Sequence, residues 1–158
     1  MVQLSGPGLT RGRRAIVRLT LGGLALAQGV IGVWALLGPG PFYATFPTAG
    51  HAWVALLPPY NEHLVRDVGA LSLALTVLLA TAAVVPSRLL VRTAVAAFAI
   101  YALPHTLFHG LHLERFSDAD AIAQMSGFAV QLLTAAVALG AVAADSRSDP
   151  ASPPREST

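Results

Sequence analysis

Histidine is the residue type with the most suggestive spacing in this chain. Three of the five histidines, His105, His109 and His112, follow the pattern H-x3-H-x2-H. At about 100° per residue, an α-helix places these three side chains on one face. Imidazole groups on one helix face suit the binding of a transition metal such as Zn, Fe, Mn or Cu.

A second polar group lies earlier in the chain, in the segment NEHLVRD. Glu62 and Arg66 are four residues apart, as are His63 and Asp67, so each pair shares a helix face. The metal hypothesis combines both groups of residues. Its candidate histidine ligands are His63, His105, His109 and His112. Glu62 and Asp67 would be further ligands or hydrogen-bond partners of the ligands. A haem held by one histidine from each group is a second form of this hypothesis.

The same residues also fit a structural role. Imidazole is stabilised at the C-terminal end of a helix, and pairs four residues apart are common on helix surfaces. Arg66 would compete with a metal for the nearby carboxylates. The sequence therefore favours an interfacial polar pocket over a metal or haem site. Its further candidate residues are Arg66, Tyr101 and Gln124.

The composition determines which kind of element must position these residues. Of 158 residues, 54% are hydrophobic and 11% are charged, whereas soluble domains carry about 25% charged residues. This composition excludes an ordinary soluble domain, a disordered chain and a nucleic-acid-binding protein. Cysteine and lysine are absent, so thiolate metal sites and Schiff-base chemistry are excluded as well.

Four apolar stretches, 16–37, 64–85, 89–109 and 121–143, are each about 21–23 residues long, enough to cross a hydrocarbon core of roughly 30 Å as a helix. The sequence therefore predicts an all-α integral membrane four-helix bundle. Because three residues separate the second and third stretches, they should be antiparallel neighbours, and the two polar groups should lie at one membrane depth. In the long first loop, a short interfacial helix is expected over 51–57.

The arginines predict the orientation of the bundle. Eight of the ten fall on one side of the four stretches, so the positive-inside rule places both termini in the cytoplasm and all five histidines in the outer half. The expected location is the inner (plasma) membrane, crossed several times. The transmembrane domain would extend over 13–144, between disordered cytoplasmic ends at 1–12 and 145–158.

Several residues have expected structural roles. Asn61 and Ser117 should cap the second and fourth spans, the latter with Asp120 as its partner. Pro104 should kink the third span just before the histidines. Glutamine in a span should hydrogen-bond a neighbouring helix, and glycine should allow close helix packing. These residues are Gln28, Gln124, Gln131, Gly22, Gly29 and Gly127.

Two blocks of the sequence resemble a known group: PPYNEHLVRDVGALSLAL (58–75) and YALPHTLFHGLHL (101–113). They resemble uncharacterised small bacterial membrane proteins with four spans. The layout is also distantly similar to the DoxX-like superfamily, with Arg18 opening a Gly-rich first span and Gly69 opening the second. The resemblance implies a compact four-helix bundle and a membrane redox partner, because some DoxX-like proteins are small subunits of quinone-linked oxidoreductases. It carries over no catalytic residue.

The sequence contains no motif of a known catalytic class, such as G-x-S-x-G, a Walker loop or H-E-x-x-H. We therefore expect a non-enzymatic accessory or structural subunit with an outward-facing His/acid polar pocket. One alternative is a metal- or haem-binding membrane redox protein. Another is a small-solute or proton path, which would require a homo-oligomer. The expected partners are the lipid bilayer and a redox partner or further copies of the chain, but not nucleic acid.

Overall fold

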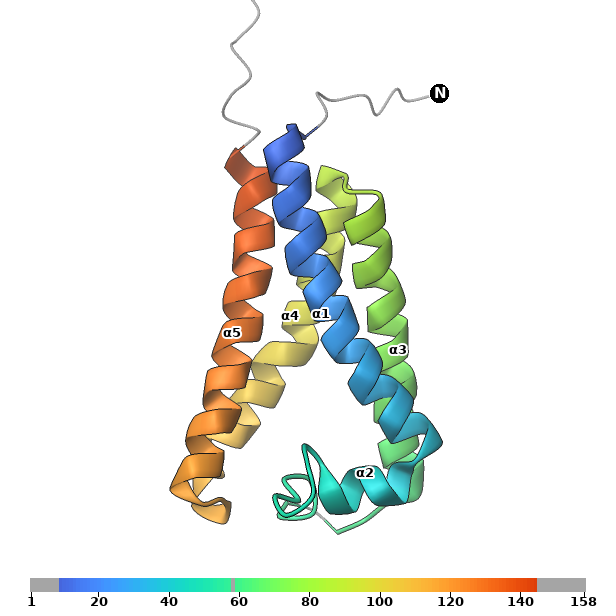
Figure 1. The fold of residues 1–158 in the computed structure, drawn as a ribbon, viewed down its shortest axis with the longest axis vertical. Helices are drawn as coiled ribbons and strands as arrows, with labels where there is room; N and C mark the ends of the chain where they lie inside the picture. The colour runs from blue at the N-terminus through green and yellow to red at the C-terminus, as the bar shows by residue number, and fades with distance from the viewer. Residues whose placement is uncertain (1–8, 58, 145–158) are drawn as a thin grey trace, which may run out of the picture.

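The computed structural model describes residues 9–57 and 59–144, which form helices and loops without a strand (Figure 1). Four long helices, α1 (Arg11–Leu37), α3 (Glu62–Val84), α4 (Arg88–Gly110) and α5 (Asp118–Ala143), are each long and apolar enough to cross a membrane. A short helix, α2 (Pro39–Thr45), follows α1, and a 3-10 turn (Leu113–Arg115) precedes α5. The predicted all-α architecture with four apolar spans is confirmed.

The helices begin where polar side chains satisfy their free backbone N–H groups. The side chains of Asn61 and Ser117 accept hydrogen bonds from the backbone at the starts of α3 and α5, as predicted. Thr10 caps α1, and Leu9 before it is buried. The predicted disorder is therefore wrong for residues 9–12. Residues 1–8 and the tail 145–158 lie outside the described residues.

The short helix predicted over 51–57 is wrong, because these residues form turns. Gly50 has a φ of 97°, and two residues later Ala52 has a φ of 50°. Such left-handed conformations interrupt a helix. The helix in this loop is instead α2. Pro39 stands at its start, where the fixed φ of proline suits a helix and its missing N–H costs nothing.

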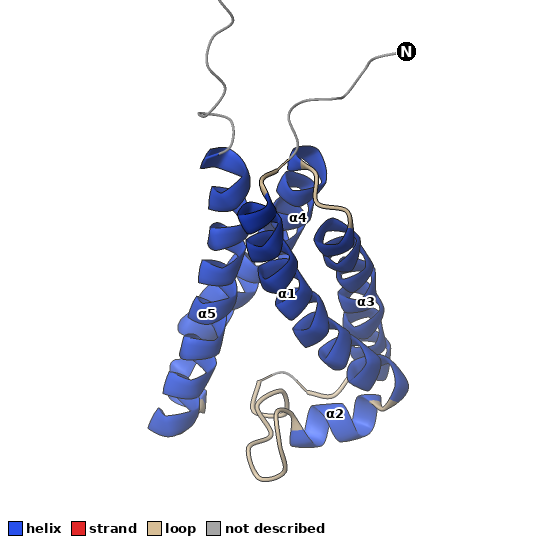
Figure 2. Ribbon diagram, turned by 45° about the horizontal axis from the view of Figure 1, so that its top comes forward, coloured by secondary structure: helices blue, strands red, loops and turns tan. Residues whose placement is uncertain are grey.

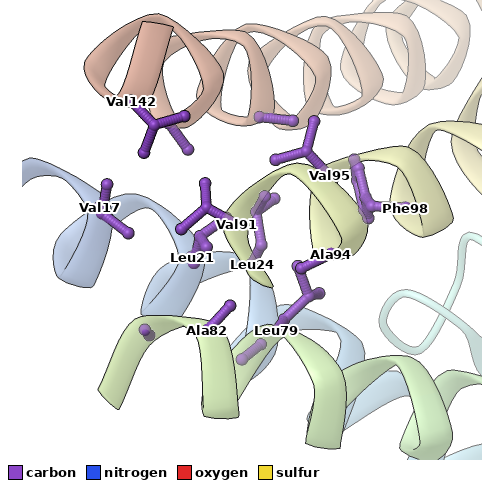
Figure 3. Close-up of a cluster of buried hydrophobic side chains, with 14 of the residues drawn as sticks. Val17, Leu21, Leu24, Leu79, Ala82, Val91, Ala94, Val95, Phe98 and Val142 are labelled. Atoms are coloured by element: carbon purple, nitrogen blue, oxygen red, sulfur yellow. The ribbon is translucent and has the colours of Figure 1, made fainter. Parts of the chain in front are cut away.

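The four long helices converge at the end where α1 begins and α5 ends, and they separate at the other end (Figures 1 and 2). Helix α1 packs most extensively on α3, while α4 and α5 form a second pair. Buried side chains from all four helices fill the converging end (Figure 3). They include Val17, Leu21, Leu79, Val91, Phe98 and Val142. The hydrophobic core thus occupies the half of the bundle near the termini.

Two glycines allow the close approach of α1 and α3. A Cβ atom on Gly69 would lie 2.5 Å from the Leu36 backbone nitrogen and 3.0 Å from the carbonyl oxygen of Gly32. Gly29 was also predicted to allow close helix packing. A Cβ added there would make an ordinary van der Waals contact with a side chain of α3. The prediction is wrong for Gly22 and Gly127, where an added Cβ would meet nothing within 4 Å.

Large apolar side chains cover the outside of the bundle. Leu19 on α1 and Ile100 on α4 are each 77% exposed, and Leu71 on α3 is 70% exposed. An apolar exterior on every long helix is unfavourable in water and suits contact with lipid. The surface therefore agrees with the length and composition of the four spans.

Candidate functional site

A cavity of about 460 Å³ lies between the two helix pairs, among the last turns of α1 and α4 and the first turns of α3 and α5. All four long helices contribute to its walls, together with α2 and the loop that follows it. The loop residues that line it include Phe46, Trp53 and Leu57. The cavity forms here because the hydrophobic core joins the helix pairs only at their other end.

Aromatic rings line two sides of this cavity. On the side of the loop, ring contacts run from Trp34 through Phe42 and Phe46 to Trp53, with centroids 4.9–6.2 Å apart. On the side of α4 and α5, the rings are those of Tyr101, Phe108 and Phe128. These residues also surround the histidines.

His105 and His109 both line the cavity, and their ring centroids are 4.7 Å apart. His105 stacks on Tyr101 at 5.3 Å and meets Phe128 of α5 edge-on at 5.2 Å. His109 also packs on Phe128, at 5.1 Å. The histidine face of α4 is thus directed toward α5, and its packing is mainly aromatic.

Three side chains bring buried polar atoms to the cavity from three different helices. Gln28 of α1, His109 of α4 and Gln124 of α5 are 1%, 8% and 2% exposed. Within the described residues, no hydrogen-bond partner is present for Gln28 Oε1, His109 Nδ1 or either amide atom of Gln124. Gln124 lies beside His109, but without a hydrogen bond of normal geometry. These atoms expose almost no surface, so they lie behind the wall of the cavity rather than on it.

The lining contains no arginine, aspartate or glutamate. Its polar members are amides, hydroxyls and imidazoles, and most of its surface is apolar. A charged molecule would lose its hydration here without gaining an opposite charge. The cavity is therefore suited to a neutral molecule.

The sequence-predicted site residues fall into separate groups. His105, His109, Tyr101 and Gln124 line the cavity, as expected of a polar pocket. His112 does not line it: its ring stacks on Phe108 at 4.2 Å and its Nδ1 lies 2.7 Å from the Phe108 carbonyl oxygen.

The four ionisable residues in the first turns of α3 also lie away from the cavity lining, although the cap residue Asn61 is part of it. His63 pairs with Asp67 at 3.3 Å, and the His63 side chain is 86% exposed. Arg66 pairs with Glu62 at 2.8 Å and donates a hydrogen bond to the Leu36 carbonyl oxygen. These contacts make two surface pairs, one of which also caps the end of α1.

The predicted convergence of the two polar groups is therefore not found. Helix α3 packs on α1 rather than along α4 at this end, and His63 does not line the cavity with the α4 histidines. In residues 9–57 and 59–144, no group of three or more histidine, aspartate or glutamate side chains is placed to hold a metal ion. Haem ligation by one histidine from α3 and one from α4 has no geometric basis here.

A tether between the loop and α5 was not predicted. His51 Nδ1 lies 2.6 Å from Asp120 Oδ1, and Trp53 Nε1 donates to the same oxygen at 2.8 Å. Ser117 Oγ donates to Asp120 Oδ2 at 2.8 Å. The spacing to Ser117 predicted only a helix-capping role for Asp120, which is confirmed. Its carboxylate also attaches one cavity wall, the loop, to another, α5.

The chain matches no family model, no curated protein and no solved structure at a significant level. The fold and the cavity define its class: an α-helical protein with four apolar spans and an internal, aromatic-lined, uncharged cavity. The DoxX-like resemblance stays a prediction.

We predict that His105→Ala lowers stability and that metal removal does not. The substitution deletes ring contacts with Tyr101 and Phe128, which are worth about 0.5–1.5 kcal/mol each. We expect the free energy of unfolding to fall by about 1–3 kcal/mol. His105→Phe, which keeps an aromatic ring, should retain most of the wild-type stability. Thermal unfolding in detergent, with and without EDTA, measures both effects. A metal site would be supported instead if EDTA lowered the melting temperature of the wild-type protein but not that of His105→Ala.

Proposed function

We propose that this chain is a multi-pass membrane protein that binds a small molecule in its cavity, without catalysis, as an accessory subunit of a larger membrane assembly. Both termini are cytoplasmic in this proposal, and the cavity lies in the outer half of the membrane. The carrying observation is the cavity itself, which measures about 460 Å³ and has largely apolar walls contributed by all four long helices.

The size and lining of the cavity support binding. Small-molecule sites typically measure about 300–1,000 Å³ and combine apolar walls with a few convergent polar groups. A ligand that fills the cavity would cover its apolar walls and so stabilise the bundle. The lining holds no carboxylate, so no acidic side chain pairs with His105 or His109 within it.

Native mass spectrometry of the protein in lipid nanodiscs tests this proposal. We expect a bound small molecule on the wild-type protein. Gly127→Leu should remove it, because Gly127 lines the cavity and an added side chain there would meet no atom at its Cβ position. Gly140→Leu is the matched control on α5, since Gly140 is also open and does not line the cavity. A wild-type protein without a bound molecule, or one whose bound molecule persists in Gly127→Leu, would contradict the proposal.

We predict the membrane orientation from the arginines. Eight of ten fall on the side of the termini, and cytoplasmic loops carry such an excess. A phosphatase reporter, active only outside the cytoplasm, should be active when fused at Gly50 and silent when fused at Ser148. The opposite pattern would place the cavity in the cytoplasmic half of the bilayer and refute the proposed orientation.

A further inference from the structure

We infer that the first turns of α1 bind an anionic phospholipid, whose phosphate is held by Arg11, Arg14 and Arg18. These three arginines line an open recess of about 690 Å³ on the surface of the bundle. Its other lining residues are Leu9, Ala15 and Leu19. The inference rests on the membrane-spanning part of the proposed function, and it is independent of the cavity between the helix pairs.

The spacing of the three arginines places them on one side of α1. At about 100° per residue, positions 11, 14 and 18 fall within about 60° of arc, and all three side chains are exposed. Arg14 Nε donates to the Leu9 carbonyl oxygen at 2.9 Å, so the backbone before α1 fixes this guanidinium beside the recess. That bond uses one of the five N–H donors of the group. Guanidinium groups bind phosphate through paired hydrogen bonds, so three of them on one side of a helix form a phosphate site.

The charges of the described residues favour an anionic headgroup. Within 9–57 and 59–144, all five acidic side chains lie in the first turns of α3 and α5 or in the 3-10 turn before α5. Six of the eight arginines in these ranges lie in the first turns of α1 and α4, which begin at the opposite end of the bundle (Figure 1). A zwitterionic headgroup would bring its own cation to this cluster of positive charge. An anionic headgroup brings a net negative charge that the arginines attract.

The apolar side of the recess favours a lipid over free phosphate. Leu19 lies one turn beyond Ala15 and is 77% exposed. Because α1 is long and apolar enough to cross a membrane, its first turns would enter the bilayer at the level of the headgroups. A phospholipid would place its phosphate on the arginines and an acyl chain along Leu19, whereas free phosphate would make only the first of these contacts. Thr10 already caps α1, so the site depends on the arginine side chains and not on the helix terminus.

Native mass spectrometry of the detergent-purified protein, titrated with dioleoyl phosphatidylglycerol or dioleoyl phosphatidylcholine, tests the inference. The two lipids share their acyl chains and differ in headgroup charge. We expect phosphatidylglycerol to bind at least about tenfold more tightly. Arg18→Gln should lower its affinity by about fivefold and leave that of phosphatidylcholine unchanged. Arg92→Gln is the matched control, since it removes an exposed arginine at the same end of the bundle but outside the recess. It should change either affinity by less than about twofold.

Arg11→Gln should repeat the result of Arg18→Gln and guards against misfolding of one variant, which thermal unfolding would reveal. Equal affinity for the two lipids, or equal losses in Arg18→Gln and Arg92→Gln, would overturn the inference. Displacement of phosphatidylglycerol by an equal concentration of glycerol phosphate would show that the site binds phosphate alone, and would overturn it too. Gly127→Leu, which fills the cavity, should leave phosphatidylglycerol affinity unchanged. Loss of that affinity in Gly127→Leu would place the lipid in the cavity and refute the site on α1, so the two binding sites are tested separately.

Discussion

Gly69→Ala is expected to force α1 and α3 apart and to lower the free energy of unfolding by about 2 kcal/mol or more. The new Cβ would lie 2.5 Å from the Leu36 backbone nitrogen and 3.0 Å from the backbone of Ala35 and Gly32. All three contacts are to backbone, so no side-chain rotation relieves them. The gain of about 1 kcal/mol in helix propensity from glycine to alanine is too small to offset this overlap.

Gly23→Ala is the matched control for this substitution. It adds the same methyl group to a long helix at a position where the Cβ meets nothing within 4 Å. We expect it to leave stability unchanged or to raise it by up to about 1 kcal/mol. Unfolding in mixed micelles with increasing SDS, followed by circular dichroism, measures both variants. Equal stability of the two would show that α1 and α3 do not cross as closely as the structure has them.

The four spans were predictable because their signal is local. Length and apolar composition define a membrane-spanning helix without reference to any other part of the chain. Capping is equally local, and Asn61 and Ser117 were correctly predicted as caps. The conformation of residues 51–57 was missed because composition does not encode a left-handed residue such as Ala52.

Which helices pair was not predictable from connection length. The short turn between α3 and α4 makes them neighbours at one end only. At the other end, the crossing of Gly32 and Gly69 holds α3 against α1. The sequence correctly predicted that His105 and His109 share a face of α4, but not that this face is directed toward Phe128 of α5. Periodicity predicts which side chains share a face, whereas tertiary packing decides what lies opposite.

Part of the glutamine prediction is confirmed. Gln28 was expected to hydrogen-bond a neighbouring helix and does so, with Tyr101 of α4. Gln124 lies beside His109 of α4, but its amide atoms lack a hydrogen bond of normal geometry.

The loop tether, in contrast, was missed. Asp120 meets His51 across 69 positions of sequence and Trp53 across 67. No spacing rule relates residues so far apart, and only the arrangement of helices brings them together.

Asp120→Ala is expected to release the loop that forms one wall of the cavity. Its carboxylate accepts hydrogen bonds from both His51 and Trp53, and hydrogen bonds to a charged group are stronger than those between neutral groups. Losing both should speed amide hydrogen exchange in residues 46–57 by about ten- to a hundredfold, since the ring contact between Phe46 and Trp53 remains. Hydrogen-exchange mass spectrometry of peptides from this loop measures the change.

Two further variants identify the cause. Asp118→Ala removes an acidic side chain from the same first turn of α5, so it reproduces the change in helix-dipole interaction and should leave loop exchange unchanged. Asp120→Asn keeps one acceptor oxygen and should have an intermediate effect. Unchanged exchange in Asp120→Ala would mean that ring packing alone holds the loop. Because Trp53 lines the cavity, release of the loop should also speed the dissociation of a molecule bound there, whereas Asp118→Ala should not.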